Sequence, residues 1–109
     1  MTLIKIRPLS VNKCWQGRRF KTKEYEDYEM EMMCLLPRQK ISQGKLKIKI
    51  IFGFSNKASD IDNCVKPLLD ILQKRLDFND KNIYKMEVEK VITKKGAEHL
   101  DFEISEIEA

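Results

Sequence analysis

The clearest alternation of hydrophobic and polar residues lies in the run KLKIKIIFGF. Leu46, Ile48 and Ile50 fall on one side of an extended segment and the lysines between them fall on the other, because successive side chains of a strand point to opposite faces. This pattern predicts a strand that buries one face. A shorter alternation at residues 2–7 predicts a first strand, which ends at Pro8.

Helical periodicity begins after Thr22, where apolar side chains recur at every third or fourth position. Thr22 is a suitable N-cap, and Pro37 marks a point that a regular helix does not pass. The sequence therefore predicts a first helix over residues 22–36. Its expected inward-facing residues are Tyr25, Tyr28, Met32, Leu35 and Leu36.

A second apolar stripe predicts a second helix. It consists of Ile61, Val65, Leu68, Leu69, Leu72 and Leu76. Pro67 lacks an amide hydrogen and is best tolerated in a first helical turn. Regular helix is therefore expected to begin near Lys66, after a leading turn that contains Asp62 and Asn63.

The remaining segments complete the predicted fold. Residues 9–21 show no hydrophobic period and are interpreted as a basic loop. Residues 84–93 and 100–107 alternate on either side of a turn at residues 94–96, so they are expected to form a β-hairpin. The order β-α-β-α-β-β favours an α+β fold of two layers, with two helices packed on a mixed sheet. We expect a single domain over residues 1–109.

Composition narrows the class of protein without identifying it. The 109 residues include 21 Lys and Arg against 17 Asp and Glu, a formal charge of +4 that many proteins without nucleic-acid partners share. Cys14, Cys34 and Cys64 are widely spaced and form no CxxC motif, so neither a disulfide framework nor a zinc site is predicted. No stretch approaches the about 20 apolar residues of a membrane span. We expect a soluble, intracellular protein with reduced thiols and no membrane partner.

Candidate chemistry begins with Asp60 and Asp62, which lie two positions apart before the second helix. An extended backbone there would point both carboxylates the same way. Such a pair is costly unless a cation or a proton neutralises it, and oxygen ligands suit Mg²⁺ or Mn²⁺ better than zinc. The alternative is that Asp62 or Asn63 only caps the helix.

Two further residues extend this constellation. Lys66 follows Asp62 by four positions, so a helical turn would return its ammonium group to the same side. The alternative for Lys66 is an ordinary surface ion pair. Asp80 follows the second helix in a polar loop, and it joins the others only if the topology returns that loop to them. Otherwise Asp80 is a turn-forming residue.

The runs SDIDNCVKPLLDILQ and FNDKNI, with the opening segment PLSVNKCW, resemble the RusA family of phage and bacterial crossover-junction endodeoxyribonucleases. The resemblance covers nearly the whole chain and is most specific between Asp60 and Ile83. It implies that the metal-binding and catalytic aspartates are Asp60, Asp62 and Asp80. It also implies that Lys66 is the active-site lysine and that Asn63 and Asp70 have supporting roles. Asp70 would orient the Lys66 amine or form a simple surface salt bridge with it.

The resemblance further implies an activity. A homodimer would bind branched DNA at four-way junctions and nick two strands symmetrically, with Mg²⁺ as cofactor and Mn²⁺ as a possible substitute. The metal would activate a water molecule, and Lys66 would offset charge that grows on the phosphate. The expected compartment is the cytoplasm of a bacterial cell or of a phage-infected or prophage-bearing host.

One departure from the family concerns DNA binding. Its members carry a dense arginine run before the first aspartate, whereas this chain has FSNKASD with only Lys57. DNA contacts are instead expected mainly from the first loop, which also carries Trp15. The residues assigned to DNA binding are Arg18, Arg19, Lys21, Lys23 and Lys57. Lys45, Lys47 and Lys49 are weaker candidates, because they also suit a solvated sheet face.

Other functions remain open on the sequence alone. The main alternative is a branched-DNA-binding module of the same fold that does not cut. A nucleotide transferase or phosphatase with a DxD motif is less favoured, because the chain leaves little room for a nucleotide pocket. His99 has no second His or Cys nearby and is interpreted as structural.

Overall fold

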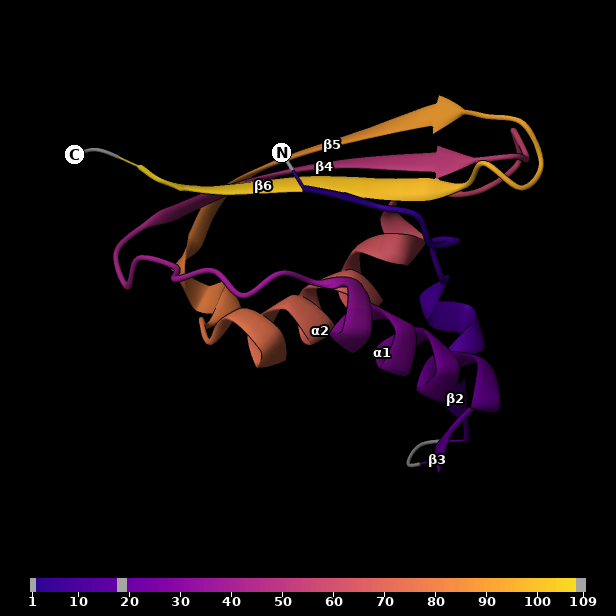
Figure 1. Cartoon of the computed structure of the whole chain (residues 1–109), viewed down its shortest axis with the longest axis horizontal. Coiled ribbons are helices and arrows are strands. Elements are labelled where there is room, and N and C mark those ends of the chain that lie inside the picture. The colour runs from indigo at the N-terminus through magenta and orange to yellow at the C-terminus, as the bar shows by residue number, and fades with distance from the viewer. Residues whose placement is uncertain (1, 18–19, 108–109) are drawn as a thin grey trace.

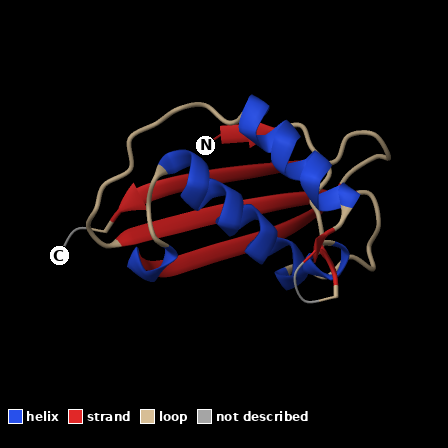
Figure 2. Ribbon diagram, turned by 90° about the horizontal axis from the view of Figure 1, so that it is seen from below, coloured by secondary structure: helices blue, strands red, loops and turns tan. Residues whose placement is uncertain are grey.

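The computed structural model describes residues 2–17 and 20–107. One layer is a four-stranded sheet with the strand order β1-β6-β4-β5, and the helices α1 and α2 cover one of its faces (Figures 1 and 2). The predicted two-layer α+β class is therefore confirmed. The bounds of these elements are β1 Thr2–Ile4, α1 Lys23–Leu35, β4 Leu46–Phe54, α2 Val65–Leu76, β5 Ile83–Ile92 and β6 His99–Glu106.

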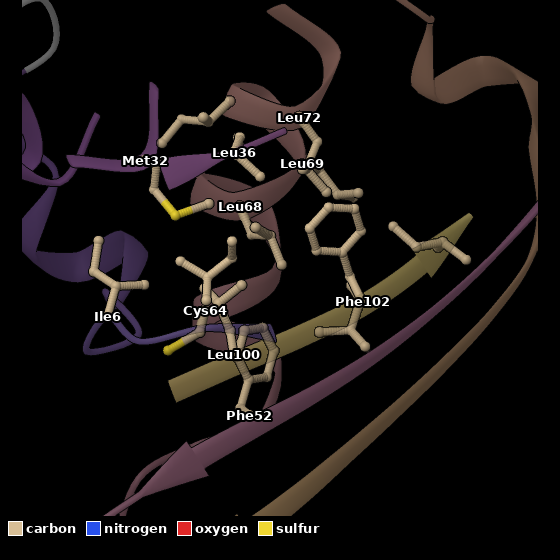
Figure 3. Close-up of a cluster of buried hydrophobic side chains, with 14 of the residues drawn as sticks. Ile6, Met32, Leu36, Phe52, Cys64, Leu68, Leu69, Leu72, Leu100 and Phe102 are labelled. Carbon is tan, nitrogen blue, oxygen red and sulfur yellow. The ribbon is translucent and has the colours of Figure 1, made fainter. Parts of the chain in front are cut away.

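The alternation in β4 builds the core. Leu46, Ile48 and Ile50 are buried on the helix-covered side, as predicted, and Phe52 continues the row. Figure 3 shows Phe52 and its neighbours on β6 facing apolar side chains of the helices. Removing each large apolar side chain from water stabilises the fold by about 1.5–3 kcal/mol, so this row fixes which face of β4 the helices cover.

The first helix begins and ends as the sequence predicts. The Thr22 side chain accepts a hydrogen bond from the Tyr25 backbone N–H, and α1 ends at Leu35, before Pro37. The prediction that Leu35 faces inward was wrong, because its side chain is 48% exposed and Leu36 takes the buried position. Leu36 is the C-cap of α1 and has extended backbone, so its side chain leaves the direction of the helical stripe and reaches the core.

The second helix also confirms its predicted start. A 3₁₀ turn, η2, spans Asp62–Cys64, and α2 follows directly at Val65. Pro67 therefore lies in the first turn of α2, where its missing N–H costs no helical hydrogen bond. The helix ends at Leu76, and its C-cap Asp77 has a φ of 55°, in the left-handed region. Neither helix in the described part of the chain has the length and apolar character of a membrane span.

The predicted hairpin of the last two strands was wrong. Both strands exist, but β4 lies between them (Figure 1), parallel to β5 and antiparallel to β6. The segment 93–98 crosses the end of β4, where the Thr93 N–H donates to the Phe54 carbonyl at 2.7 Å. The strongly apolar β4 gains burial in the central position, whereas β5 is exposed along much of its length and lies at an edge.

The segment 9–21, predicted to be a loop without regular structure, contains three short elements. They are the 3₁₀ turn η1 Val11–Lys13 and the antiparallel strands β2 Trp15–Gln16 and β3 Phe20–Lys21. Strands of two residues are too short to produce a hydrophobic period, so no pattern in the sequence indicates them. Gly17 has a φ of 66° beside the turn of this small hairpin, a conformation that glycine adopts without strain.

Candidate active site

Asp60 and Asn63 lie at the exit of the loop that follows β4. The Asn63 side-chain N–H donates to Asp60 Oδ2 at 3.2 Å, as their spacing across η2 allows. Both side chains line a hollow of about 480 Å³. The carboxylate of Asp60 is therefore accessible, and its neighbour Asn63 limits its orientation.

A lysine from the edge strand β5 holds the loop that carries Asp60. Lys90 Nζ donates to the carbonyl oxygens of Lys57 at 3.0 Å and Ser59 at 2.9 Å. The loop also closes on itself, since Asn56 Oδ1 accepts from the Ala58 N–H at 2.8 Å. The backbone immediately before Asp60 is thus fixed from outside the loop and from within it.

Glu98 is a second anchor of the same region. Its carboxylate accepts hydrogen bonds from Ser55 Oγ at 2.8 Å, from the Gly96 N–H at 2.8 Å and from Arg7 Nη2 at 3.3 Å. Hydrogen bonds from its own backbone N–H, from Ser55, from Gly96 and from Arg7 lower the pKa of Glu98 to about 2, against the opposing effect of burial. Glu98 therefore stays ionised and joins three segments of chain around the hollow.

Lys66 and Asp70 form an ion pair on α2. The distance from Lys66 Nζ to Asp70 Oδ1 is 2.8 Å, the i, i+4 contact that a helix permits. The hydrogen bond with Asp70, then the charge of Asp70 and that of Asp80, raise the pKa of Lys66. The Lys66 side chain is 61% exposed, so it presents a permanently positive group to solvent. It is suited to charge stabilisation and not to the role of a general base.

Asp80 lies beside the middle of α2, in the 3₁₀ turn η3 Asp80–Asn82. Gln73 Oε1 accepts from the Asp80 N–H at 2.9 Å, while Gln73 Nε2 donates to the Leu69 carbonyl at 3.2 Å. Asp80 and Leu69 also line one shallow hollow of about 270 Å³. The topology therefore returns the loop after α2 to the helix, close enough for the charge of Asp80 to act on Lys66.

The carboxylates of this region offer few protein ligands to a divalent ion. Within residues 2–17 and 20–107, no group of three or more His, Cys, Asp or Glu side chains is arranged to hold a metal ion. Asp60 and Asp62 are both exposed carboxylates. Mg²⁺ commonly keeps several waters and binds through one or two carboxylates. Two exposed carboxylates are chemically suited to a partly hydrated Mg²⁺ ion, whereas the described residues do not form a closed cage of protein ligands.

The residues assigned to DNA binding are in different environments. Lys21 Nζ lies 2.6 Å from Glu29 Oε1, and its hydrogen bond with Glu29 raises the pKa of Lys21. Lys23 and Lys57 are exposed. Arg18 and Arg19 lie outside the described residues. Lys21 is therefore already paired with a carboxylate, while Lys23 and Lys57 remain accessible.

The aromatic residue of the first segment is packed as well as exposed. Trp15 is 44% exposed, and its ring lies edge-on to the ring of Tyr25, with centroids 5.7 Å apart. Tyr25 is buried at the start of α1. Trp15 therefore anchors the small hairpin against α1 with one side and offers the other to solvent.

Four residues of this region were missed by the sequence analysis. Arg7, Gln73, Lys90 and Glu98 act through contacts between segments that are distant along the chain. No spacing rule relates such partners.

The fold is a small two-layer α+β domain that carries exposed carboxylates and an exposed lysine around the start of α2. Residues 6–103 match the family model of Endodeoxyribonuclease RusA. The chain belongs to this family, as the resemblance in its sequence indicated, and it is by membership an endodeoxyribonuclease. A comparison with curated protein sequences found no match.

Proposed function

We propose that this protein is a magnesium-dependent crossover-junction endodeoxyribonuclease that resolves four-way DNA junctions by paired symmetric nicks. The observation that supports this most is the match to the RusA family over residues 6–103, which includes Asp60, Asp62, Lys66 and Asp80. The substrate would be branched DNA of a bacterial cell or its phage, encountered in the cytoplasm.

The roles of the chain's own residues follow from their environments. Asp60 and Asp62 would hold Mg²⁺, with Asp80 as the third carboxylate of the site. When bound, Mg²⁺ supplies an activated water and neutralises charge on the phosphate. Lys66, kept protonated by Asp70, would stabilise the negative charge that develops on the phosphate oxygens. Asn63 limits the orientation of Asp60 through its hydrogen bond.

Paired nicks at symmetric positions require two equivalent sites. A homodimer with two-fold symmetry supplies them, because each subunit then faces one of two equivalent strands. We therefore propose a homodimer as the active form. Its molecular mass in solution should be about twice the 12.9 kDa of the chain.

The experiment uses a synthetic four-way junction labelled in turn on each strand. With Mg²⁺, the wild-type protein should release two nicked duplexes cut at symmetric positions, and Mn²⁺ should support the same products. Asp62→Asn and Asp80→Asn should bind the junction but cut at least about 100-fold more slowly. A linear duplex of equal length is the control substrate. Absence of paired nicks in the wild type would contradict the proposal.

One observation supports a second candidate function. The three aspartates do not form a ready ligand group within the described residues, which also suits a branched-DNA-binding module that does not cut. This alternative predicts tight junction binding without added metal and no cleavage product at any Mg²⁺ or Mn²⁺ concentration. The same labelled junction distinguishes the two functions.

A further inference from the structure

The hollow beside Asp60 is lined by two cationic side chains from the N-terminal segment. Arg7 and Lys13 border the same space as Asp60 and Asn63, although they are distant in sequence. Lys57 is the only cation in the five residues before Asp60. Any DNA strand brought to Asp60 must therefore find its other cationic contacts on neighbouring segments.

The ion pair with Glu98 orients Arg7 and uses only part of its hydrogen-bonding capacity. Its guanidinium donates to Glu98 through Nη2 at 3.3 Å, and the side chain is 72% exposed. A guanidinium group has several N–H donors in a planar fork, so one bond to Glu98 leaves others free. The remaining donors suit a phosphate, which a guanidinium can bind through two parallel hydrogen bonds.

Glu98 gives Arg7 a fixed position. The Glu98 side chain is only 8% exposed, and Ser55 and Gly96 hold its carboxylate independently of Arg7. An exposed ion pair between two mobile side chains would not hold the guanidinium in one position. Here Glu98 is nearly buried and hydrogen-bonded to Ser55 and Gly96, so it orients Arg7 at the rim of the hollow before any ligand arrives.

Lys13 approaches the hollow from a second fixed element. It ends the turn η1, in which Ser10 Oγ accepts from the Asn12 N–H. The Lys13 carbonyl also accepts a hydrogen bond from the Thr22 hydroxyl at the start of α1. Within the described residues, no carboxylate lies within ion-pair distance of the exposed Lys13 ammonium.

From these contacts we infer that Arg7, held by Glu98, forms with Lys13 a binding site for a backbone phosphate of the DNA strand that reaches Asp60. This inference adds a DNA contact to the proposed function and rests on that function. The lining also includes the carboxylates of Glu24, Asp60 and Glu98. Because Glu98 is occupied by its hydrogen bonds, the repulsion that a phosphate meets comes mainly from Glu24 and Asp60. A divalent ion at Asp60 would remove part of it, so the phosphate contact should be stronger in the presence of Mg²⁺.

The test measures junction affinity at several salt concentrations, with the metal chelated so that no cleavage occurs. Arg7→Ala should weaken binding by about 10-fold or more, as expected for loss of a charge-assisted pair. Its plot of log affinity against log salt should be shallower by about 0.9. Arg7→Lys should keep the slope and recover part of the affinity, because it restores charge without the fork.

Two further variants distinguish the effect of the position of Arg7 from the effect of its positive charge. Arg38→Ala removes the same charge from a separate hollow at the end of α2 and should change affinity by less than about threefold. Glu98→Gln leaves the charge of Arg7 but loosens its anchor, so the salt slope should stay at the wild-type value while affinity falls. In Mg²⁺ at a temperature that prevents turnover, the loss caused by Arg7→Ala should increase.

Three results would contradict the phosphate site, and a fourth would contradict the proposed function instead. Equal effects of Arg7→Ala and Arg38→Ala would overturn the inference, as would an Arg7→Ala protein that loses thermal stability but keeps the wild-type salt slope. If Arg7→Ala does not fold, the comparison of Arg7→Lys with wild type decides, because unchanged affinity there excludes recognition by the fork. A wild-type protein that neither binds nor cuts junctions would instead contradict the proposed function.

Discussion

The side-chain amide of Gln73 joins Asp80 to the middle of α2. One end accepts from the Asp80 N–H at 2.9 Å, and the other donates to the Leu69 carbonyl at 3.2 Å. A residue that follows α2 in sequence is thereby returned to the level of its central turns. The contact of Asp80 with α2 thus runs through a neutral residue that carries no catalytic chemistry of its own.

Gln73→Leu tests whether cleavage depends on how Asp80 is positioned, because this variant keeps the Asp80 carboxylate and removes the side chain that holds its backbone. Loss of the two hydrogen bonds should lower the free energy of unfolding by about 1–2 kcal/mol. Cleavage of a four-way junction should slow by about 10-fold or more while junction affinity is retained, because a small displacement of a catalytic group is costly. Gln73→Glu keeps an acceptor for the Asp80 N–H and should recover part of the rate. Wild-type cleavage by Gln73→Leu would contradict this role.

Lys66→Ala should spare junction binding and slow cleavage. The removed charge is expected to act on the transition state, so single-turnover cleavage should fall by about 100–1000-fold. Stability should change by less than about 1 kcal/mol, because the pair with Asp70 is largely exposed. Asp70→Asn keeps the lysine and should have a smaller effect on rate. Equal loss of binding and cleavage in Lys66→Ala would assign this lysine to DNA binding instead.

Gly53→Ala should destabilise the pairing of β4 with the start of β6. The His99 ring lies directly over Gly53, so a Cβ atom there would collide with the ring. Overpacking of this kind costs about 1–3 kcal/mol. The double variant Gly53→Ala/His99→Ala removes the obstacle and should recover most of that loss, measured as a coupling free energy in denaturant unfolding. Purely additive effects would show that the ring moves aside freely.

Features that depend on residues close together in sequence were predicted correctly. The face that β4 buries, the Thr22 cap and the turn before α2 are set by neighbours within a few residues, and the structure confirms them. The neighbours of β5 and β6 are not set in this way. Both strands show the alternation that a hairpin or an edge strand would show. Their separation becomes apparent only in the sheet, where β4 pairs with β6 on one side and with β5 on the other.

The same distinction applies to the candidate site. The pair Lys66–Asp70 follows from helical spacing and was anticipated, whereas the hydrogen bond from Asn63 to Asp60 was not. Nothing in the local sequence relates Lys90 to Ser59 or Arg7 to Glu98, because these contacts exist only after the sheet has formed. The gathering of Asp60, Asp62 and Asp80 around one metal ion stays a prediction that a metal-bound structure would test.

The three cysteines should differ sharply in reactivity. Cys34 is exposed, whereas Cys14 and Cys64 are buried. Burial raises the pKa of each buried thiol to about 11, so very little thiolate is present at pH 8. A maleimide reagent should therefore add one label to the native protein within minutes, located at Cys34 by peptide mass spectrometry. Unfolding in denaturant should expose all three thiols. Rapid double labelling of the native protein would contradict the burial of Cys14 or Cys64.

Glu98 should make stability depend on acid pH. A carboxylate with a pKa of about 2 when folded and about 4.3 when unfolded binds more protons in the unfolded chain between those values. Its contribution to stability is therefore complete above the unfolded pKa and is lost as the pH falls through the folded pKa. Glu98→Gln should be less stable than wild type at pH 7, and denaturant unfolding should show this difference shrinking steadily from pH 5 towards pH 2. Glu31→Gln, which changes an exposed glutamate of α1, is the control for loss of charge. A difference for Glu98→Gln that stays constant over this range would mean that its carboxylate is not held by Ser55, Gly96 and Arg7 in solution.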